Sequence, residues 1–112
     1  MSTNNFHGII LYDIELSECL NGVWTNQPNK GVIRNEIAKR VIKGSDEIVG
    51  TYQSSYIEID DNIHRGTLTI TIEPTEVGVY SFLWVYENGN TFKGKGYRMN
   101  ERQITVHYWE GK

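Results

Sequence analysis

The chain has 112 residues, a formal charge of −3 and 22% charged side chains, which suits one soluble domain over residues 1–112 and excludes a large multidomain enzyme. With 11 basic against 14 acidic side chains there is no pervasive positive field, so nucleic acid is disfavoured as a partner. Isoleucine, valine and threonine occur 13, 8 and 9 times, whereas alanine occurs once, and this composition predicts an all-β protein.

The first elements are short. Alternating β-branched residues predict a strand over 7–16, and residues 17–22 are expected to form one helical turn closed by an Asn-Gly pair. A short strand over 23–27 follows. Residues 28–31 then have the composition of a turn.

The middle of the chain contains its most ambiguous stretch. Residues 32–43 suit either a helix or a bulged strand, and we favour the strand. A turn at 44–46 leads into a long strand over 47–59, which ends at the polar cluster 60–62.

The last strands have clearer signals. Residues 65–73 alternate between aliphatic side chains and threonines, and a proline ends this strand. Residues 79–86 also alternate, and the Asn88-Gly89 pair that follows predicts a two-residue hairpin turn. The return strand is expected over 91–98 and the final one over 103–109.

Eight short strands with short connections predict a sequential antiparallel meander. Closing such a sheet on itself removes exposed edges and leaves an interior for side chains or one small ligand. We therefore expect an eight-stranded up-and-down barrel rather than a sandwich.

Several strands place rings and small polar groups on one face. The candidate inward rows are Tyr80, Phe82, Trp84 and Tyr86; Phe92, Gly94 and Gly96; Gly50, Tyr52, Ser54 and Tyr56; and Thr105, His107 and Trp109. Either these rows line a small-molecule pocket with a few orienting polar groups, or the rings fill the barrel as an ordinary core.

The opposite faces are also apolar. Their candidate outward residues are Leu83, Val85, Ile104, Val106 and Tyr108. Strands that are apolar on both sides are usually covered on both sides, so we expect a homo-oligomer, a dimer or tetramer. The same surface suits a protein-interaction module, such as a small acidic inhibitor or accessory subunit. Lys93, Lys95 and Arg98 beside aromatic strands resemble a single-strand nucleic-acid platform, although a solvated outer face explains them more simply.

Signals for catalysis and metal binding are thin. His7, His64 and His107 lie on separate elements, and no pair has ligand spacing, so we expect no metal site. There is no GxSxG motif and no glycine-rich phosphate loop. A small barrel enzyme that uses His107 as a general base stays an alternative, but we favour a non-catalytic protein without a cofactor.

The environment is expected to be cytoplasmic. Cys19 is the single cysteine and cannot form an intrachain disulfide, which fits a reducing compartment. The N-terminus lacks the basic region and long apolar run of a signal peptide, and no stretch approaches the roughly 20 apolar residues that span a membrane.

Five short motifs occur in the order found in the avidin and streptavidin group of calycin barrels. Gly22-Val23-Trp24-Thr25-Asn26 resembles the Gly-x-Trp-x-Asn motif of that group, and Gly50-Thr51-Tyr52 resembles its Gly-Thr-Tyr. The segments 81–84, 92–96 and 104–109 resemble later strands of the group, so the resemblance spans residues 20–109.

The resemblance implies a calycin-type, lipocalin-like barrel with a ligand in its interior. Asn26 and Tyr52 would hydrogen-bond a carbonyl of the ureido type, Ser54 would contact the edge of the ligand ring, and Trp84 and Trp109 would wall the pocket. Trp24 would close the end of the barrel.

The chain departs from this family at two places. Lys30 stands where the family has a serine, and the sequence ends at Lys112, before the family's last two strands. Both departures argue against biotin as the ligand. The strand at 7–16 is expected to close the barrel instead, by pairing with residues 103–109.

These observations together predict a non-catalytic protein that binds a small hydrophobic or ring-bearing molecule. The candidate ligand-binding residues are Asn26, Tyr52, Ser54, Tyr80, Trp84, His107 and Trp109.

Overall fold

The computed structural model describes residues 7–15, 18–26, 34–57 and 62–111. All regular secondary structure in these ranges is β-strand. The strands are β1 (His7–Ile14), β2 (Cys19–Asn26), β3 (Arg34–Lys43), β4 (Gly50–Ile57), β5 (Ile63–Ile72), β6 (Val79–Tyr86), β7 (Thr91–Asn100) and β8 (Gln103–Glu110). The predicted turn at 28–31, which contains Lys30, and residues 60 and 61 of the acidic cluster lie outside the described residues. Among the described residues, no helix is long and apolar enough to cross a membrane.

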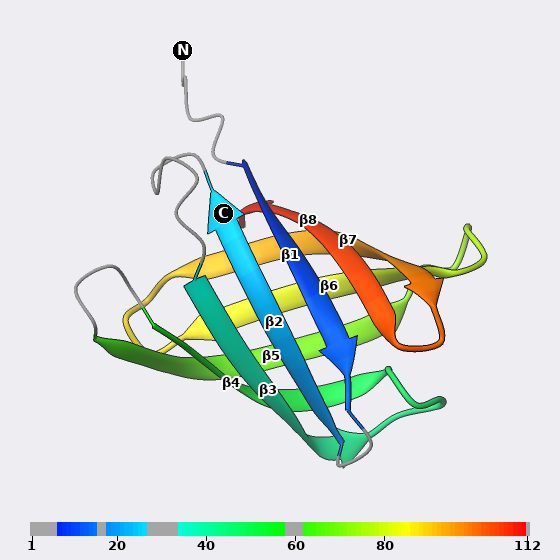
Figure 1. Ribbon diagram of the computed structural model, residues 1–112, viewed down its shortest axis with the longest axis horizontal. Coiled ribbons are helices and arrows are strands. Elements are labelled where there is room, and N and C mark those ends of the chain that lie inside the picture. The colour runs from blue at the N-terminus through cyan, green and yellow to red at the C-terminus, as the bar shows by residue number, and fades with distance from the viewer. Residues whose placement is uncertain (1–6, 16–17, 27–33, 58–61, 112) are drawn as a thin grey trace.

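The eight strands form a closed antiparallel barrel in sequential order (Figure 1). β1 pairs with β2 on one side and with β8 on the other. The register between β1 and β8 runs from His7 opposite Trp109 to Asp13 opposite Gln103. This confirms the predicted up-and-down barrel and its closure by the N-terminal strand. Every strand thus has two neighbours, so the sheet has no edge to protect.

The barrel interior is filled mainly by aromatic and aliphatic side chains. Its buried apolar residues are Ile10, Tyr12, Leu20, Trp24, Ala38, Ile48, Tyr52, Tyr56, Leu68, Ile70, Tyr80, Phe82, Trp84, Tyr86, Ile104, Val106 and Tyr108. The packing is close enough to require glycine on β1, because a Cβ at Gly8 would lie 2.1 Å from the ring of Tyr108. The predicted inward rows on β4, β6 and β7 are confirmed.

Residues 34–43 form a strand, as we favoured. The register between β3 and β4 shifts between Arg40 and Ile42, which is the predicted bulge. The expected start of the next strand at residue 47 is wrong, because β4 begins at Gly50. Residues 44–49 instead form a loop that inserts the fully buried Ile48 into the end of the barrel.

Two predicted turns have a different form. The helical turn at 17–22 is wrong, because β2 already begins at Cys19. Glu18, just before this strand, has a positive φ of 66°. The hairpin between β6 and β7 has a three-residue loop rather than two, since the amide of Gly89 donates to the Tyr86 carbonyl and Gly89, but not Asn88, has a positive φ. This is a type I turn followed by a left-handed glycine.

The two faces of β8 are reversed relative to the prediction. Ile104, Val106 and Tyr108 are buried inside the barrel, whereas His107 lies exposed on the outer surface and Trp109 is half-buried there. Both rows contain large apolar side chains, and a one-residue difference in register exchanges them. The pairing with β1 selects the aliphatic row for the interior, because Ile10 and Val106 lie opposite each other.

Candidate functional site

A buried carboxylate lies at the centre of the barrel. Glu36, which is only 3% exposed, accepts hydrogen bonds from the Tyr12 hydroxyl (2.7 Å), the Ser54 hydroxyl (2.6 Å) and the Trp84 indole (3.3 Å). The Tyr86 hydroxyl lies 2.7 Å from that of Ser54 and extends the network. Four strands, β1, β3, β4 and β6, thus place polar atoms on one network, which is called the Glu36 network below.

Burial controls the electrostatics of the Glu36 network. Loss of hydration raises the pKa of Glu36, and the three donated hydrogen bonds oppose this shift only in part. Among the described residues, ion pairs involve Glu18, Glu47, Glu73 and Glu76, but not Glu36. Burial and the nearby Glu36 also raise the pKa of Tyr12 well above its usual value. The phenols therefore stay protonated and act as donors at neutral pH.

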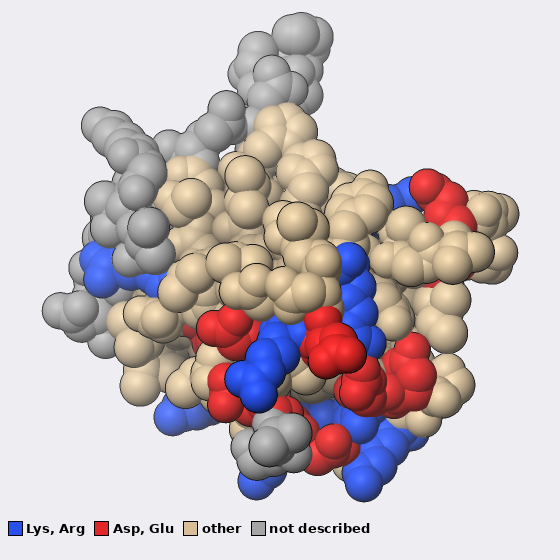
Figure 2. Space-filling view, turned by 45° about the vertical axis from the view of Figure 1, so that its right-hand side comes forward, with Lys and Arg blue, Asp and Glu red and all other residues tan. Residues whose placement is uncertain are grey.

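One end of the barrel is capped by Arg40. Its guanidinium donates to both carboxylate oxygens of Glu18, at 2.7 and 3.0 Å, and to the carbonyls of Asp46 and Val49 at 2.7 and 2.9 Å. The Asp46 carboxylate in turn accepts the amides of Ile48 and Val49 and the hydroxyl of Tyr80. Acidic and basic side chains gather at this lower end of the molecule (Figure 2). Polar contacts and Ile48 thus close this end.

The other end carries a collar of aromatic rings. Trp24, Tyr56, Tyr86, Phe92 and Tyr108 follow one another in edge-to-face contacts, with ring centroids 4.7 to 6.1 Å apart. This arrangement confirms that Trp24 belongs to the end of the barrel. The indole of Trp24 donates to the carbonyl of Asn35, which holds the ring against β3.

The predicted ligand-binding residues do not form one site. Ser54 and Trp84 meet on Glu36, whereas Tyr52 donates to the Ile48 carbonyl (2.6 Å) and Tyr80 to Asp46 (3.1 Å) at the capped end. Asn26 lies at the aromatic collar, where its side-chain amide donates to the Tyr108 hydroxyl at 3.1 Å. The prediction that His107 and Trp109 face the same interior is wrong, because both lie on the outer surface.

Sequence reasoning missed Glu36. Within β3 the aliphatic residues Ile37 and Val41 lie on the face opposite Glu36 and Ala38. Hydrophobicity therefore predicts that Ile37 and Val41 are buried, whereas the structure buries Glu36 and Ala38. The one usable signal is Ala38, the single alanine of the chain, which sits fully buried beside Leu20 of β2. A small residue suits a crowded interior, and Glu36 shares its face.

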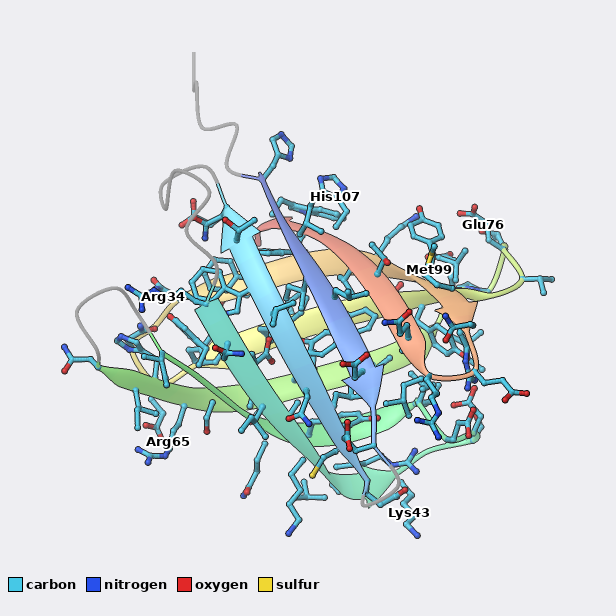
Figure 3. All side chains as sticks on the ribbon, viewed as in Figure 1. Arg34, Lys43, Arg65, Glu76, Met99 and His107 are labelled. Atoms are coloured by element: carbon cyan, nitrogen blue, oxygen red, sulfur yellow. The ribbon has the colours of Figure 1, made fainter. Side chains whose placement is uncertain are left out.

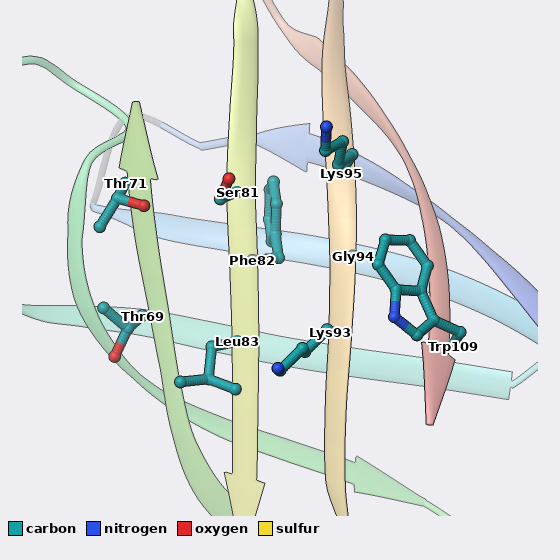
Figure 4. A pocket seen from close by; sticks show the side chains of 9 residues that line it. All are labelled: Thr69, Thr71, Ser81, Phe82, Leu83, Lys93, Gly94, Lys95 and Trp109. Atoms are coloured by element: carbon teal, nitrogen blue, oxygen red, sulfur yellow. The ribbon is translucent and has the colours of Figure 1, made fainter. Parts of the chain in front are cut away.

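The outer surface has a groove of about 310 Å³ across β5 to β8. Its lining residues are Thr69, Thr71, Ser81, Phe82, Leu83, Lys93, Gly94, Lys95 and Trp109. Figure 4 shows threonines on one side of β6, lysines of β7 on the other, and the indole of Trp109 beside β7. We call this the β5–β8 groove.

The two lysines of the β5–β8 groove differ in their partners. The ammonium of Lys95 lies 3.7 Å from Glu73 and 3.8 Å from Glu76. Lys93 forms no ion pair with any described residue, and its side chain runs toward Leu83. The groove therefore offers an indole, an aliphatic floor, hydroxyls and the ammonium of Lys93, which has no ion-pair partner among the described residues.

Comparison of the chain with family models, curated proteins and solved structures finds no match in any of the three. The strand order and closure alone establish the eight-stranded up-and-down barrel, which is compatible with a calycin-like fold.

Proposed function

We propose that this chain is a non-catalytic binding protein for a small, flat, ring-bearing anion, and that the ligand lies in the β5–β8 groove. The observation that supports this proposal is that one outer surface combines a groove, the half-buried Trp109 and Lys93, a lysine with no ion pair to any residue in the described ranges. Ligand sites combine apolar walls with a few polar groups that set orientation, and this groove has both.

The groove suits such a ligand better than the interior does. The interior groups that a resemblance to avidin assigns to a ligand are engaged within the protein, Tyr52 with Ile48 and Ser54 with Glu36. A ligand of the biotin type would have to break both bonds, and each unsatisfied buried group costs about 1–3 kcal/mol. In the groove the hydroxyls of Thr69 and Thr71 and the ammonium of Lys93 face solvent-accessible space.

The proposal can be tested with two fluorescent probes that differ in one charge. Anilinonaphthalenesulfonate has flat rings and a sulfonate, whereas N-phenyl-1-naphthylamine has the same rings without it. We expect Trp109→Ala to weaken binding of both probes, and Lys93→Ala to weaken only the sulfonate by roughly tenfold, because a charge-assisted contact contributes about 1.5 kcal/mol or more.

Lys43→Ala is the matched control, since this lysine is 75% exposed and lies at the capped end. It should leave both affinities unchanged. If Trp109→Ala and Lys93→Ala both bind the sulfonate as the unmodified protein does, the groove is not the site. A separate screen of metabolites by native mass spectrometry would identify the class of the natural ligand.

Self-association is the second candidate function. Four exposed aliphatic side chains lie on the outer face of β1 to β3: Ile9, Leu11, Val23 and Ile37, between 36% and 56% exposed. We propose that a second copy covers them about a two-fold axis parallel to the strands. This axis places β1 of one copy on β3 of the other. Asp13 is then level with Ile37 of the second copy and diagonally adjacent to Lys39, whose long exposed side chain can reach it.

A charge exchange tests this interface. Lys39→Asp should shift the protein toward monomer in light scattering, because Asp13 of the second copy then meets a like charge. The double variant Asp13→Lys with Lys39→Asp should restore the dimer. A monomer in the unmodified protein at all concentrations would exclude the interface.

A further inference from the structure

Closure of the barrel brings together two histidines that are 100 residues apart. His7 on β1 and His107 on β8 are both exposed, and Nδ1 of His7 lies 3.2 Å from Nε2 of His107. Their rings are nearly parallel, with an interplanar angle of 21° and centroids 5.3 Å apart. In the barrel register, His7 lies opposite Trp109 and Ile9 opposite His107, so the two imidazoles are diagonal neighbours on the outer surface. Figure 3 shows His107 extending outward from β8.

The separation of the two nitrogens matches the spacing of two ligands on one metal ion. With metal–nitrogen bonds of about 2.0–2.1 Å, two ligands are about 2.9 Å apart at a right angle and about 3.4 Å apart at a tetrahedral angle. The observed 3.2 Å lies between these values. Without a metal, the same contact needs one ring to donate its proton to the other.

The surroundings permit a cation at this place. Lys95 is the cross-strand neighbour of His107, but its ammonium is directed to Glu73 and Glu76. Within the described parts of the chain, no group of three or more His, Cys, Asp or Glu residues converges. Water would therefore have to supply the remaining ligands of an ion held by the two imidazoles.

We propose that His7 and His107 form a surface site for a divalent transition metal of the zinc, nickel or copper type. Neutral imidazole suits these ions, and two imidazoles chelate one ion without rearrangement of the strands. Binding of the ion replaces the hydrogen bond between the two rings, and both nitrogens then act as ligands. This site borders the β5–β8 groove, because the rings of His107 and Trp109 have centroids 5.4 Å apart, but it uses neither Lys93 nor the groove hydroxyls.

Calorimetric titration of metal-stripped protein with zinc chloride tests the proposal. We expect about one zinc ion per chain, and a loss of at least tenfold in affinity in His7→Ala and in His107→Ala. His64→Ala is the matched control, since this histidine lies on β5 against Tyr56 and Asn88, and it should bind zinc as the unmodified protein does.

Amide NMR spectra provide the second readout. Zinc should shift amide resonances around His7 in β1 and around His107 in β8. Circular dichroism should show unchanged folding of the two variants, because both side chains are exposed. Unchanged zinc affinity in His7→Ala and His107→Ala would overturn the proposal. Equal losses in those variants and in His64→Ala would overturn it as well.

Discussion

Glu36→Ala is expected to lower the free energy of unfolding by about 3–5 kcal/mol, measured by urea denaturation at neutral pH. The alanine removes the acceptor of three buried donors, on Tyr12, Ser54 and Trp84, and leaves a cavity beside them. Each buried donor without a partner carries a penalty of about 1–3 kcal/mol, and small shifts of the rings recover only part of this loss.

Ser54→Ala is the control for this prediction. It removes one of the three donors to Glu36 and the contact of the Tyr86 hydroxyl with Ser54, but it leaves Glu36 with the Tyr12 and Trp84 bonds. We therefore expect a smaller loss, about 1–2 kcal/mol. Equal effects of the two substitutions would contradict a role of Glu36 as the common acceptor.

The pH dependence of stability provides a further test of the same residue. Because the pKa of Glu36 is raised in the folded state, the folded protein binds this proton more tightly than the unfolded chain does. Its contribution to stability is complete below about pH 4.3, where glutamate in an unfolded chain titrates, and is lost as the pH rises through the folded pKa. Glu36→Gln should remove this decline, so the difference between the two stability curves should grow with pH across that window.

Glu18 and Asp46 contribute with the opposite sign. Hydrogen bonds from Arg40 lower the pKa of Glu18, and backbone amides and Tyr80 lower that of Asp46 despite its partial burial. Both therefore stabilise the fold above the usual carboxyl range and lose this effect as the pH falls. Glu36→Gln leaves the contributions of Glu18 and Asp46 unchanged. The difference between the stability curves of the variant and the unmodified protein therefore reports on Glu36 alone.

The strands were predictable because they depend on local patterns, and closure of the barrel followed from the number of strands and their short connections. The alternation over 65–73 and 79–86, and the Asn88-Gly89 pair, mark strands and a turn whatever their neighbours are. The assignment of faces is different. β8 has Val106 and Tyr108 on one side and His107 and Trp109 on the other, and only its pairing with β1 decides which row is buried.

The candidate sites depend on contacts that local patterns do not contain. The Glu36 network needs β1, β3, β4 and β6 in their final register before its donors meet. The approach of His7 to His107 needs the barrel to close. A histidine spacing rule that applies within one strand therefore excluded a pair formed between the first and last strands.

Arg40→Ala is expected to lower the free energy of unfolding by about 3 kcal/mol or more, because the side chain is only 5% exposed and has acceptors on both connecting segments at the capped end. Its loss removes the Arg40 donor from the carbonyls of Asp46 and Val49, of which Val49 keeps the amide of Gly44, and weakens the packing of the loop that buries Ile48. Arg40→Lys should recover little of this, since an ammonium does not reproduce the planar fork that reaches Glu18 and the loop together.

Lys43→Ala separates this effect from simple charge loss. Lys43 lies 3.8 Å from the same Glu18 oxygen but is 75% exposed, so its removal should change stability by less than about 1 kcal/mol. High salt should abolish the small Lys43 effect and leave most of the Arg40 effect, because screening acts on exposed charges and not on buried hydrogen bonds. Comparable losses of stability for Arg40→Ala and Lys43→Ala, or an Arg40 effect that disappears in salt, would contradict this prediction. Surface charge would then hold this end of the barrel closed, and the hydrogen bonds from Arg40 to the loop carbonyls would contribute little.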